Sequence, residues 1–381
     1  MSISEEPVRS WAGLDVESFR SAAAAWLSEW SPFAPSDYGA IVPEAEIETA
    51  VAWQRRLADA GLTGLHWPVR WGGQGLTPAH TAAWLEECAR AKVPPFLNMV
   101  GLVLTAEALL AYGTEEQKAF HLPPLRTGDR LWCQLFSEPE AGSDLAGLHT
   151  RARRSETGWV LEGTKVWTSN GHLADWGICL ARTDDSVATH RGLSFFLVDM
   201  RAPGIEVRAL RQITGACEFD EVVFNDAELA PEALLGEPGA GWAVAMSTLT
   251  HERNHIGALG IRLSQRLDQL VTEAGAGPLF RDRVLQLWVR GKALVALGGQ
   301  QARLGPAAAS LMKLGVAQLS TAVADLGADL AGPASMLAGA AAAELIAAPA
   351  AEIAGGTTQI QKTIVGERLL RLSREPAPIR P

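Results

Sequence analysis

The strongest chemical signal is the stretch WCQLFSEPEAGSD, residues 132–144, in which a short apolar run passes into a polar loop. Ser137, Ser143 and the free backbone N–H groups of such a loop can hydrogen-bond the polar edge of a planar heterocycle. A plain polar turn is the alternative interpretation. The stretch alone therefore indicates a ligand loop without proving one.

A second stretch, GTKVWTSNG, residues 163–171, combines a large aromatic residue with hydroxyl groups. Alternation along a strand predicts that Trp167 and Ser169 point to the same face. An indole can stack beside a ring while the nearby hydroxyl bonds its polar atoms. A core tryptophan followed by a surface serine is the alternative.

The turn Gly355–Gly356, followed by two threonines, predicts a loop that brings bare backbone close to a ligand. The turn holds no carboxylate, histidine or cysteine. Glu352 lies before it, where we expect it to be solvated, and Glu367 lies well after it. We therefore expect the turn to supply no general base.

Composition limits the class of protein. The chain has 381 residues, 48% hydrophobic and 20% charged, which is typical of an ordered globular protein. Its net charge of −10 argues against nucleic acid and anionic membranes as partners, although solubility explains that charge equally well.

No apolar run reaches the ~18 residues of a membrane span, and the acidic, polar start is not that expected of a signal peptide. Four dispersed cysteines predict reduced thiols and a cytoplasmic protein.

The elements that must position these residues fall into three zones. Helical patterns fill residues 1–129, short β-branched or aromatic runs fill 130–237, and helical patterns return in 238–381. This order predicts an α+β fold with an antiparallel sheet or small barrel between two helical domains. No Gly-x-Gly-x-x-Gly follows a strand, which argues against a Rossmann site.

Local patterns predict individual element ends. Thr77 before Pro78 favours a helix start at 78, and Thr114 with Gln117 has capping-box spacing. The stretch GWVLEGTKVWTSNG is interpreted as two strands joined at Glu162–Gly163. The runs LSFFLVDM, IEVRAL and EVVFND are expected to be further strands.

Four stretches in this order and spacing resemble the acyl-CoA dehydrogenase family: WCQLFSEPEAGSD, GTKVWTSNGHLADWGICLART, FLVDMRAPGIEV and GGTTQIQKTIVGERLL. The resemblance covers nearly the whole chain. It implies an N-terminal helical domain, a middle β-barrel or sandwich domain and a C-terminal four-helix bundle. It also implies FAD as cofactor, an acyl-CoA substrate, a dimer or tetramer, and electron-transfer flavoprotein as the electron acceptor.

The resemblance assigns cofactor contacts position by position. The family's hydroxyl before Glu-Pro is Ser137, its Gly-Ser pair is Gly142 and Ser143, and its flavin-facing aromatic is Trp167 with Ser169 two residues later. Two serines stand where the family often has threonine, and both keep the hydroxyl. The remaining implied contacts are Gln134, Leu135 and Phe136 along the strand, and Thr357 and Gln359 in the last motif.

The family reaction removes an α proton next to a thioester carbonyl while a β hydride passes to the flavin, so it needs a general base. Many members carry that glutamate where this chain has Gly355. A second family solution places it on a helix before an arginine, which matches Glu252 and Arg253. We therefore interpret Glu252 as the base, with a solvated Glu–Arg pair as the alternative. The Gly355 N–H is expected to bind the thioester oxygen, and Ser143 and Arg253 to contact substrate.

Two family segments are missing. The Arg-x-x-Phe-Gly stretch that holds the FAD pyrophosphate has no counterpart in TEAGAGPLFRDRVLQL, and the usual Gln-x-x-Gly-Gly is absent before the last motif. These gaps resemble a subgroup found in actinobacterial steroid side-chain degradation and natural-product pathways, some of whose members are α2β2 heteromers. Two alternatives remain at this point: an oxidase-like enzyme for a non-CoA acyl substrate, and a non-catalytic partner subunit.

Overall fold

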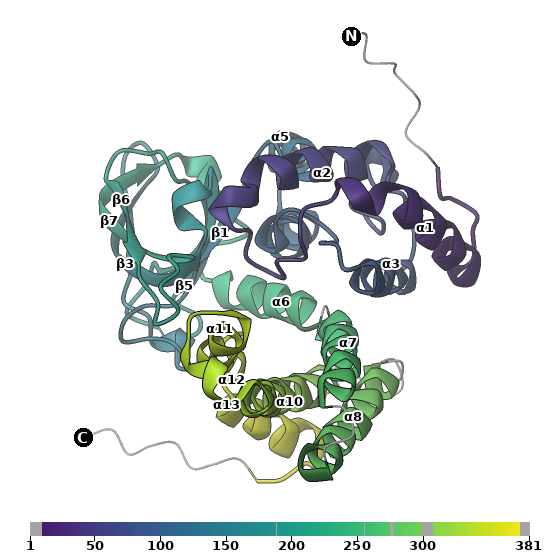
Figure 1. Cartoon of the computed structure of the whole chain (residues 1–381). Coiled ribbons are helices and arrows are strands. Elements are labelled where there is room, and N and C mark those ends of the chain that lie inside the picture. Colours follow the sequence, from purple (N-terminus) through teal and green to yellow (C-terminus); the bar gives the residue numbers. More distant parts are fainter. Residues whose placement is uncertain (1–9, 188, 255, 275–277, 299–307, 374–381) are drawn as a thin grey trace. The chain divides into compact units, whose positions relative to one another are not determined.

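The computed structural model describes residues 10–187, 189–254, 256–274, 278–298 and 308–373 (Figure 1). The chain folds into two compact units, the first extending to His251 and the second beginning at Glu252. Helices come first along the chain, a sheet follows, and helices return, as the sequence predicts. Within the described ranges, no helix is long and apolar enough to cross a membrane.

Helices dominate the first part of the first unit, and their starts follow the predicted caps. The helix at residue 78 begins after Thr77, which forms a capping box with His80. At the next predicted start, the Thr114 N–H donates to Gln117 Oε1 over 2.9 Å and the Gln117 N–H donates to Thr114 Oγ1 over 3.2 Å. Both predictions are confirmed. The helices are α1 (Val16–Trp30), α2 (Ile47–Asp59), α3 (Pro78–Ala91), α4 (Ala106–Tyr112) and α5 (Glu115–Thr127), with a π-helical turn at Val100–Thr105.

A single curved sheet of eight strands follows in the same unit. The strands are β1 (Trp132–Leu135), β2 (Arg151–Arg154), β3 (Trp159–Ser169), β4 (Trp176–Arg182), β5 (Leu193–Asp199), β6 (Ile205–Leu210), β7 (Phe219–Leu229) and β8 (Leu234–Leu235). Their order is β6-β7-β3-β2-β4-β5-β8, with β1 paired to β4 off this path. The sheet is mixed rather than antiparallel as predicted, because β1 and β2 both run parallel to β4.

The predicted hairpin at Glu162–Gly163 is wrong, since β3 runs unbroken through both residues. Gly163 instead allows a close backbone approach: it has φ +146°, and a Cβ there would lie 2.5 Å from Thr150 Oγ1. The pairing with β7 shifts register at this place, where Asp226 adopts φ +49°. A β-bulge and a turn both favour glycine, so the sequence alone could not show which of the two Gly163 forms.

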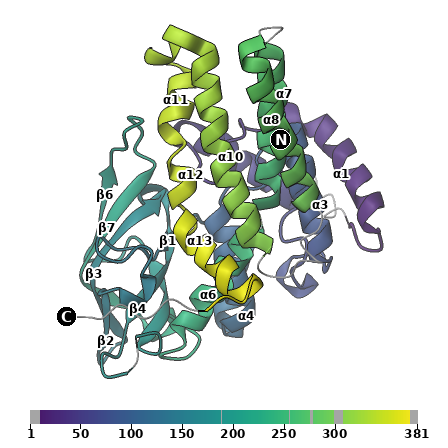
Figure 2. The ribbon, with the colours of Figure 1, turned by 90° about the horizontal axis from the view of Figure 1, so that it is seen from below.

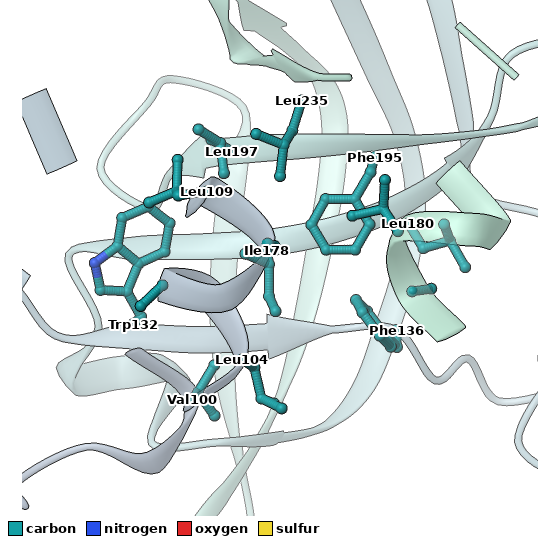
Figure 3. Packing of buried hydrophobic residues seen from close by; sticks show 14 of the residues in the cluster. Val100, Leu104, Leu109, Trp132, Phe136, Ile178, Leu180, Phe195, Leu197 and Leu235 are labelled. Carbon is teal, nitrogen blue, oxygen red and sulfur yellow. The ribbon is translucent and has the colours of Figure 1, made fainter. Parts of the chain in front are cut away.

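Strands β1, β4 and β5 are buried on both faces, which explains their nearly continuous apolar sequences. One face packs with α4, the π-helical turn and α6 (Gly241–Asn254) into a large core cluster (Figure 3). The opposite face contributes Cys133, Leu135 and Cys179 to a second cluster inside the curved sheet. Two separate core clusters therefore hold β1 in place, one on each face.

The second unit is helical (Figure 2). The described α-helices of this unit are α7 (Ile256–Ala274), α8 (Pro278–Gly298), α10 (Ala308–Ala331), α11 (Ala340–Ala347), α12 (Ala350–Ile353) and α13 (Thr358–Ile364). Helices α7, α8 and α10 pack on one another around Leu267, Leu319 and Leu326. Arg266 of α7 pairs with Glu344 of α11 over 3.1 Å.

A buried histidine in the first unit makes stability depend on pH. His121 is 4% exposed, packs edge-on against Trp132 and Trp176, and its Nδ1 has no hydrogen-bond partner among the described residues. Burial, with a smaller contribution from the charge of Arg130, lowers the pKa of His121 from 6.5 to about 4. The unfolded chain therefore binds this proton first as the pH falls.

We expect wild-type protein to lose about 3 kcal/mol of unfolding free energy relative to His121→Phe between about pH 7 and pH 4. The folded pKa lies below the unfolded one, so the neutral histidine stabilises the fold above about pH 6.5 and this contribution is lost toward pH 4. Urea unfolding of both proteins across this range measures the difference. A difference that stays constant with pH would contradict the assignment.

Candidate active site

The polar residues of the first predicted motif extend from the C-terminal end of β1. Gln134 lies in the strand opposite Ile178, half-buried, and Ser137 lies two residues past the strand end, also half-buried. Since β1 and β4 are parallel, the segments that follow both strands leave the sheet at the same edge. The Gln134 amide and the Ser137 hydroxyl have no hydrogen-bond partner in the described part of the chain, so both are available to a ligand.

The Phe136 side chain is buried in the core rather than open to a ligand. Its ring is 4% exposed and meets Phe195 edge-on, with the ring centroids 5.6 Å apart (Figure 3). Its carbonyl accepts a hydrogen bond from Lys165. The side chain of this predicted contact residue therefore belongs to the core, as does that of Leu135, which is fully buried.

Trp167 lies on β3 beside the end of β1. The Val166 N–H donates to the Ser137 carbonyl over 2.9 Å, which joins the two motifs directly. The pairing of β3 with β7 shifts between Lys165 and Thr168, and within this bulge Trp167 adopts φ +61°. Its indole is 60% exposed and meets Phe219 edge-on at 5.9 Å. A left-handed backbone is a strained state for a bulky residue, and such strain clusters at functional sites.

Burial differs from residue to residue at 167–169. Thr168 is fully buried, whereas Trp167 is exposed and Ser169 is half-buried. Ser169 lies on the same strand as the exposed indole. Ser137 lies on the segment that is bonded to this strand through Val166. We call Ser137, Trp167 and Ser169 the aromatic wall.

The loop after β1 carries Gly142 and Ser143, both exposed. A Cβ added at Gly142 would meet no atom within 4 Å, so this glycine leaves open space in front of the backbone. Arg182 holds the returning part of the loop, since its Nη2 donates to the Ala146 carbonyl over 2.8 Å and its Nε to the Leu148 carbonyl over 3.2 Å. The loop is therefore anchored at its base and open at its tip.

A buried ion pair lies beneath the aromatic wall. Lys165 Nζ is 2.8 Å from Glu138 Oε1, and the two side chains are 0% and 5% exposed. Glu138 also accepts from the backbone N–H groups of His149 and Thr150, over 2.6 and 2.9 Å. Burial acts to raise the pKa of Glu138, but the charge of Lys165 and these hydrogen bonds hold the pKa below its usual value.

These residues fit a flavin-like ring. An exposed indole provides a stacking surface, and hydroxyls without partners among the described residues provide hydrogen bonds to polar ring atoms. Ser137, Ser143 and Ser169 supply those hydroxyls, and Gln134 supplies a half-buried amide. These groups are half-buried or exposed, so they can hydrogen-bond a ligand.

The Gly-Gly turn lies in the second unit. Gly355 is exposed with φ +64°, and its carbonyl accepts from Gln361 Nε2 over 3.1 Å. Within the described ranges its N–H has no partner, so it can donate to a ligand oxygen. Thr357 caps α13, its Oγ1 accepting from the Ile360 N–H, and Gln359 is exposed.

Glu352, expected to be solvated, is half-buried and accepts from the Thr321 hydroxyl over 3.1 Å. Glu252 and Arg253 lie on α6 by their backbone, and their side chains fall outside the described part of the structure. Their predicted roles therefore stay predictions.

Sequence reasoning missed a basic cavity of about 880 Å³ in the first unit. Arg182, which anchors the Ser143 loop, also lines this cavity. Asp185 pairs with Arg151 over 3.2 Å, whereas Arg191 has no acidic partner in the described part of the chain. The run RARR at 151–154 was the available signal. The arginines lining the cavity are Arg151, Arg153, Arg154, Arg182 and Arg191, against Asp184 and Asp185.

Comparison with known proteins places this fold in the class of acyl-CoA oxidoreductases. Residues 17–129, 133–227 and 239–370 match the N-terminal, middle and C-terminal domains of acyl-CoA dehydrogenase. The chain is 39% identical over 382 residues to the acyl-CoA dehydrogenase IpdE1 of Mycobacterium tuberculosis, covering 95% of this chain and 99% of that protein. The chain therefore belongs to the acyl-CoA dehydrogenase family and is an oxidoreductase.

Solved structures share the whole fold. The Tcur3481-Tcur3483 steroid ACAD aligns with a TM-score of 0.83 at 23% identity, covering 97% of this chain and 100% of that one. The ChsE4-ChsE5 complex from Mycobacterium tuberculosis aligns with a TM-score of 0.79 at 25% identity, covering 98% and 100%. Both are complexes of two named chains. The predicted likeness to the steroid-related subgroup is confirmed by these relatives.

Proposed function

We propose that this chain binds FAD on the aromatic wall and oxidises the α,β carbon–carbon bond of an acyl-CoA thioester. The observation that supports this most is the exposed, strained Trp167, which precedes Ser169 by two residues and follows Val166, whose N–H bonds the Ser137 carbonyl. Gln134, Gly142, Ser143, Thr357 and Gln359 complete the proposed cofactor contacts. Bound FAD would supply the hydride acceptor that no side chain provides.

The chain's own groups perform the proton chemistry in this proposal. Glu252 accepts the α proton, and the Gly355 N–H donates to the thioester oxygen, which makes that proton more acidic. Such a donor is worth about 3–4 kcal/mol to a transition state when it is preorganised. Ser143 and Arg253 orient the substrate. The named relatives favour a dehydrogenase over the oxidase-like and non-catalytic alternatives.

The basic cavity gives the coenzyme A part of the substrate a place to bind. Coenzyme A carries a diphosphate and a ribose phosphate, and arginine is the side chain best suited to phosphate. Arg182 contacts both the cavity and the base of the Ser143 loop, so the two sites are adjacent in the same unit. We propose that Arg154 and Arg191 receive these phosphates.

Partners are proposed from the relatives and from the missing segments. A related chain in an α2β2 heteromer would complete the FAD pyrophosphate site, and a homo-oligomer is the alternative. Electron-transfer flavoprotein is the proposed electron acceptor.

The four cysteines are free, which supports a reducing cytoplasmic location. The steroid-related relatives support a steroid side chain or similar bulky acyl group.

Anaerobic titration of the purified oligomer tests this function. We expect yellow protein whose flavin absorbance bleaches with a suitable acyl-CoA. The matching N-acetylcysteamine thioester lacks the nucleotide, so we expect it to require a concentration at least about 10-fold higher, the effect of losing one charged phosphate contact. Folded protein that stays colourless with added FAD and a related partner chain would overturn the proposal.

A further inference from the structure

The buried Lys165–Glu138 pair occupies an unusual place for charged side chains. Lys165 is fully buried, and a buried ammonium is tolerated only when its protons are bonded. All three have acceptors: Glu138 Oε1 at 2.8 Å, the Leu180 carbonyl at 2.8 Å and the Phe136 carbonyl at 3.1 Å. The network is complete, so it rigidifies its surroundings.

The pair ties together the segments that carry the aromatic wall. Phe136 and Glu138 flank Ser137, so two of the three bonds from Lys165 hold the chain on either side of that hydroxyl. The third holds β4 through Leu180. Glu138 in turn accepts from His149 and Thr150, which closes the loop that contains Gly142 and Ser143.

The same lysine precedes the strained residue. Val166 bonds the Ser137 carbonyl, Trp167 takes the left-handed backbone, and Thr168 returns to the buried side opposite Asp220. A strained conformation persists only where its surroundings over-determine it. Lys165 is the buried anchor on the N-terminal side of the bulge.

Stability alone does not explain a buried pair, because well-packed apolar residues of similar volume often stabilise a fold equally well or better. We propose that Lys165 and Glu138 are positioning residues that fix the Ser137 hydroxyl and the Trp167 indole in the geometry that receives FAD. This rests on the proposed function for its ligand. The bonds of the pair hold the backbone on either side of Ser137, and Lys165 lies two residues before Trp167, so the pair acts through these two wall residues.

The experiment separates position from stability with two variants of the full chain in its native oligomer. Lys165→Met leaves Glu138 charged and buried, whereas Lys165→Met/Glu138→Gln removes both charges but still leaves the Phe136 and Leu180 carbonyls without the ammonium. We expect the double variant to regain most of the thermal stability that the single variant loses. We expect both to bind FAD about 10-fold or more weakly, with an altered visible spectrum of the bound flavin.

Hydrogen exchange of flavin-free protein provides a readout that needs no cofactor. The Val166 amide, bonded to the Ser137 carbonyl, should exchange about 10-fold faster in both variants if the anchor is lost. Arg20→Met is the matched control, because Arg20 pairs with Glu87 between α1 and α3, away from the wall. Arg20→Met should lower thermal stability and leave both the FAD affinity and the Val166 exchange rate unchanged.

Three results would decide between a positioning role and a merely structural role for the Lys165–Glu138 pair. Recovery of FAD affinity and Val166 protection together with stability in the double variant would make the pair merely structural and overturn the inference. The same losses in Arg20→Met would overturn it too. A protein that never binds FAD defeats the proposed function, while Val166 exchange still decides whether Lys165 fixes the bulge.

Discussion

Glu252→Gln is expected to slow substrate-dependent flavin reduction by about 10²–10⁴-fold, the usual contribution of a positioned base. Glutamine is nearly isosteric and can still hydrogen-bond, so fold and flavin content should remain. It cannot accept the α proton, so the rate of the chemical step should fall while substrate binding changes little. Stopped-flow reduction with saturating acyl-CoA under anaerobic conditions measures this rate.

Glu352→Gln is the matched control for that substitution. Glu352 precedes the Gly-Gly turn and bonds Thr321, so the same chemical change there should leave the reduction rate unchanged. Gly355→Glu in the Glu252→Gln background should restore only part of the rate. Position 355 has φ +64°. A side chain in that left-handed conformation costs about 1–2 kcal/mol. Reduction by Glu252→Gln at the wild-type rate would show that another group is the base.

Trp167→Ala is expected to weaken FAD binding by about 10–100-fold, since stacking a planar base on an aromatic side chain contributes about 1–3 kcal/mol. Trp167→Phe should keep most of the affinity. Stability of the flavin-free protein should change little in either variant, because the indole is 60% exposed. Calorimetric titration of FAD into apoprotein gives the affinity, and urea unfolding gives the stability.

Trp167→Gly separates the ring from the backbone strain. It removes the same ring as the alanine variant and also relieves the left-handed backbone, so apoprotein carrying glycine should be at least as stable as apoprotein carrying alanine. Its FAD affinity should be as low as that of the alanine variant. Unchanged FAD affinity in both would show that the indole does not face the cofactor.

Several features could be predicted from the sequence because their causes are local. The caps at Thr77 and Thr114 depend on residues within one helical turn, and the order of helices, strands and helices follows from hydrophobic periodicity. The loop glycines and hydroxyls at Gly142, Ser143 and Gly355 were recognisable for the same reason. The four motifs also identified the family, because their order and spacing are specific to it.

The hairpin prediction failed because Gly163 serves a long-range contact. Its lack of a Cβ admits Thr150, which lies on a different segment, and no local pattern distinguishes that need from a turn. The inward orientation of Phe136 has a similar origin. A phenyl ring beside a ligand loop and one packed on Phe195 have the same local sequence.

By itself the sequence determined the three-part organisation and the family, and it identified the hydroxyls and glycines that we propose contact a flavin and a thioester. Only the tertiary structure decided that Lys165 and Glu138 meet in the interior, that five arginines line one cavity, and that Trp167 is strained and exposed. The physical reason is distance along the chain. Lys165 and Glu138 are 27 residues apart in the sequence. Their attraction becomes strong only after β1, β3 and β4 pair and exclude water.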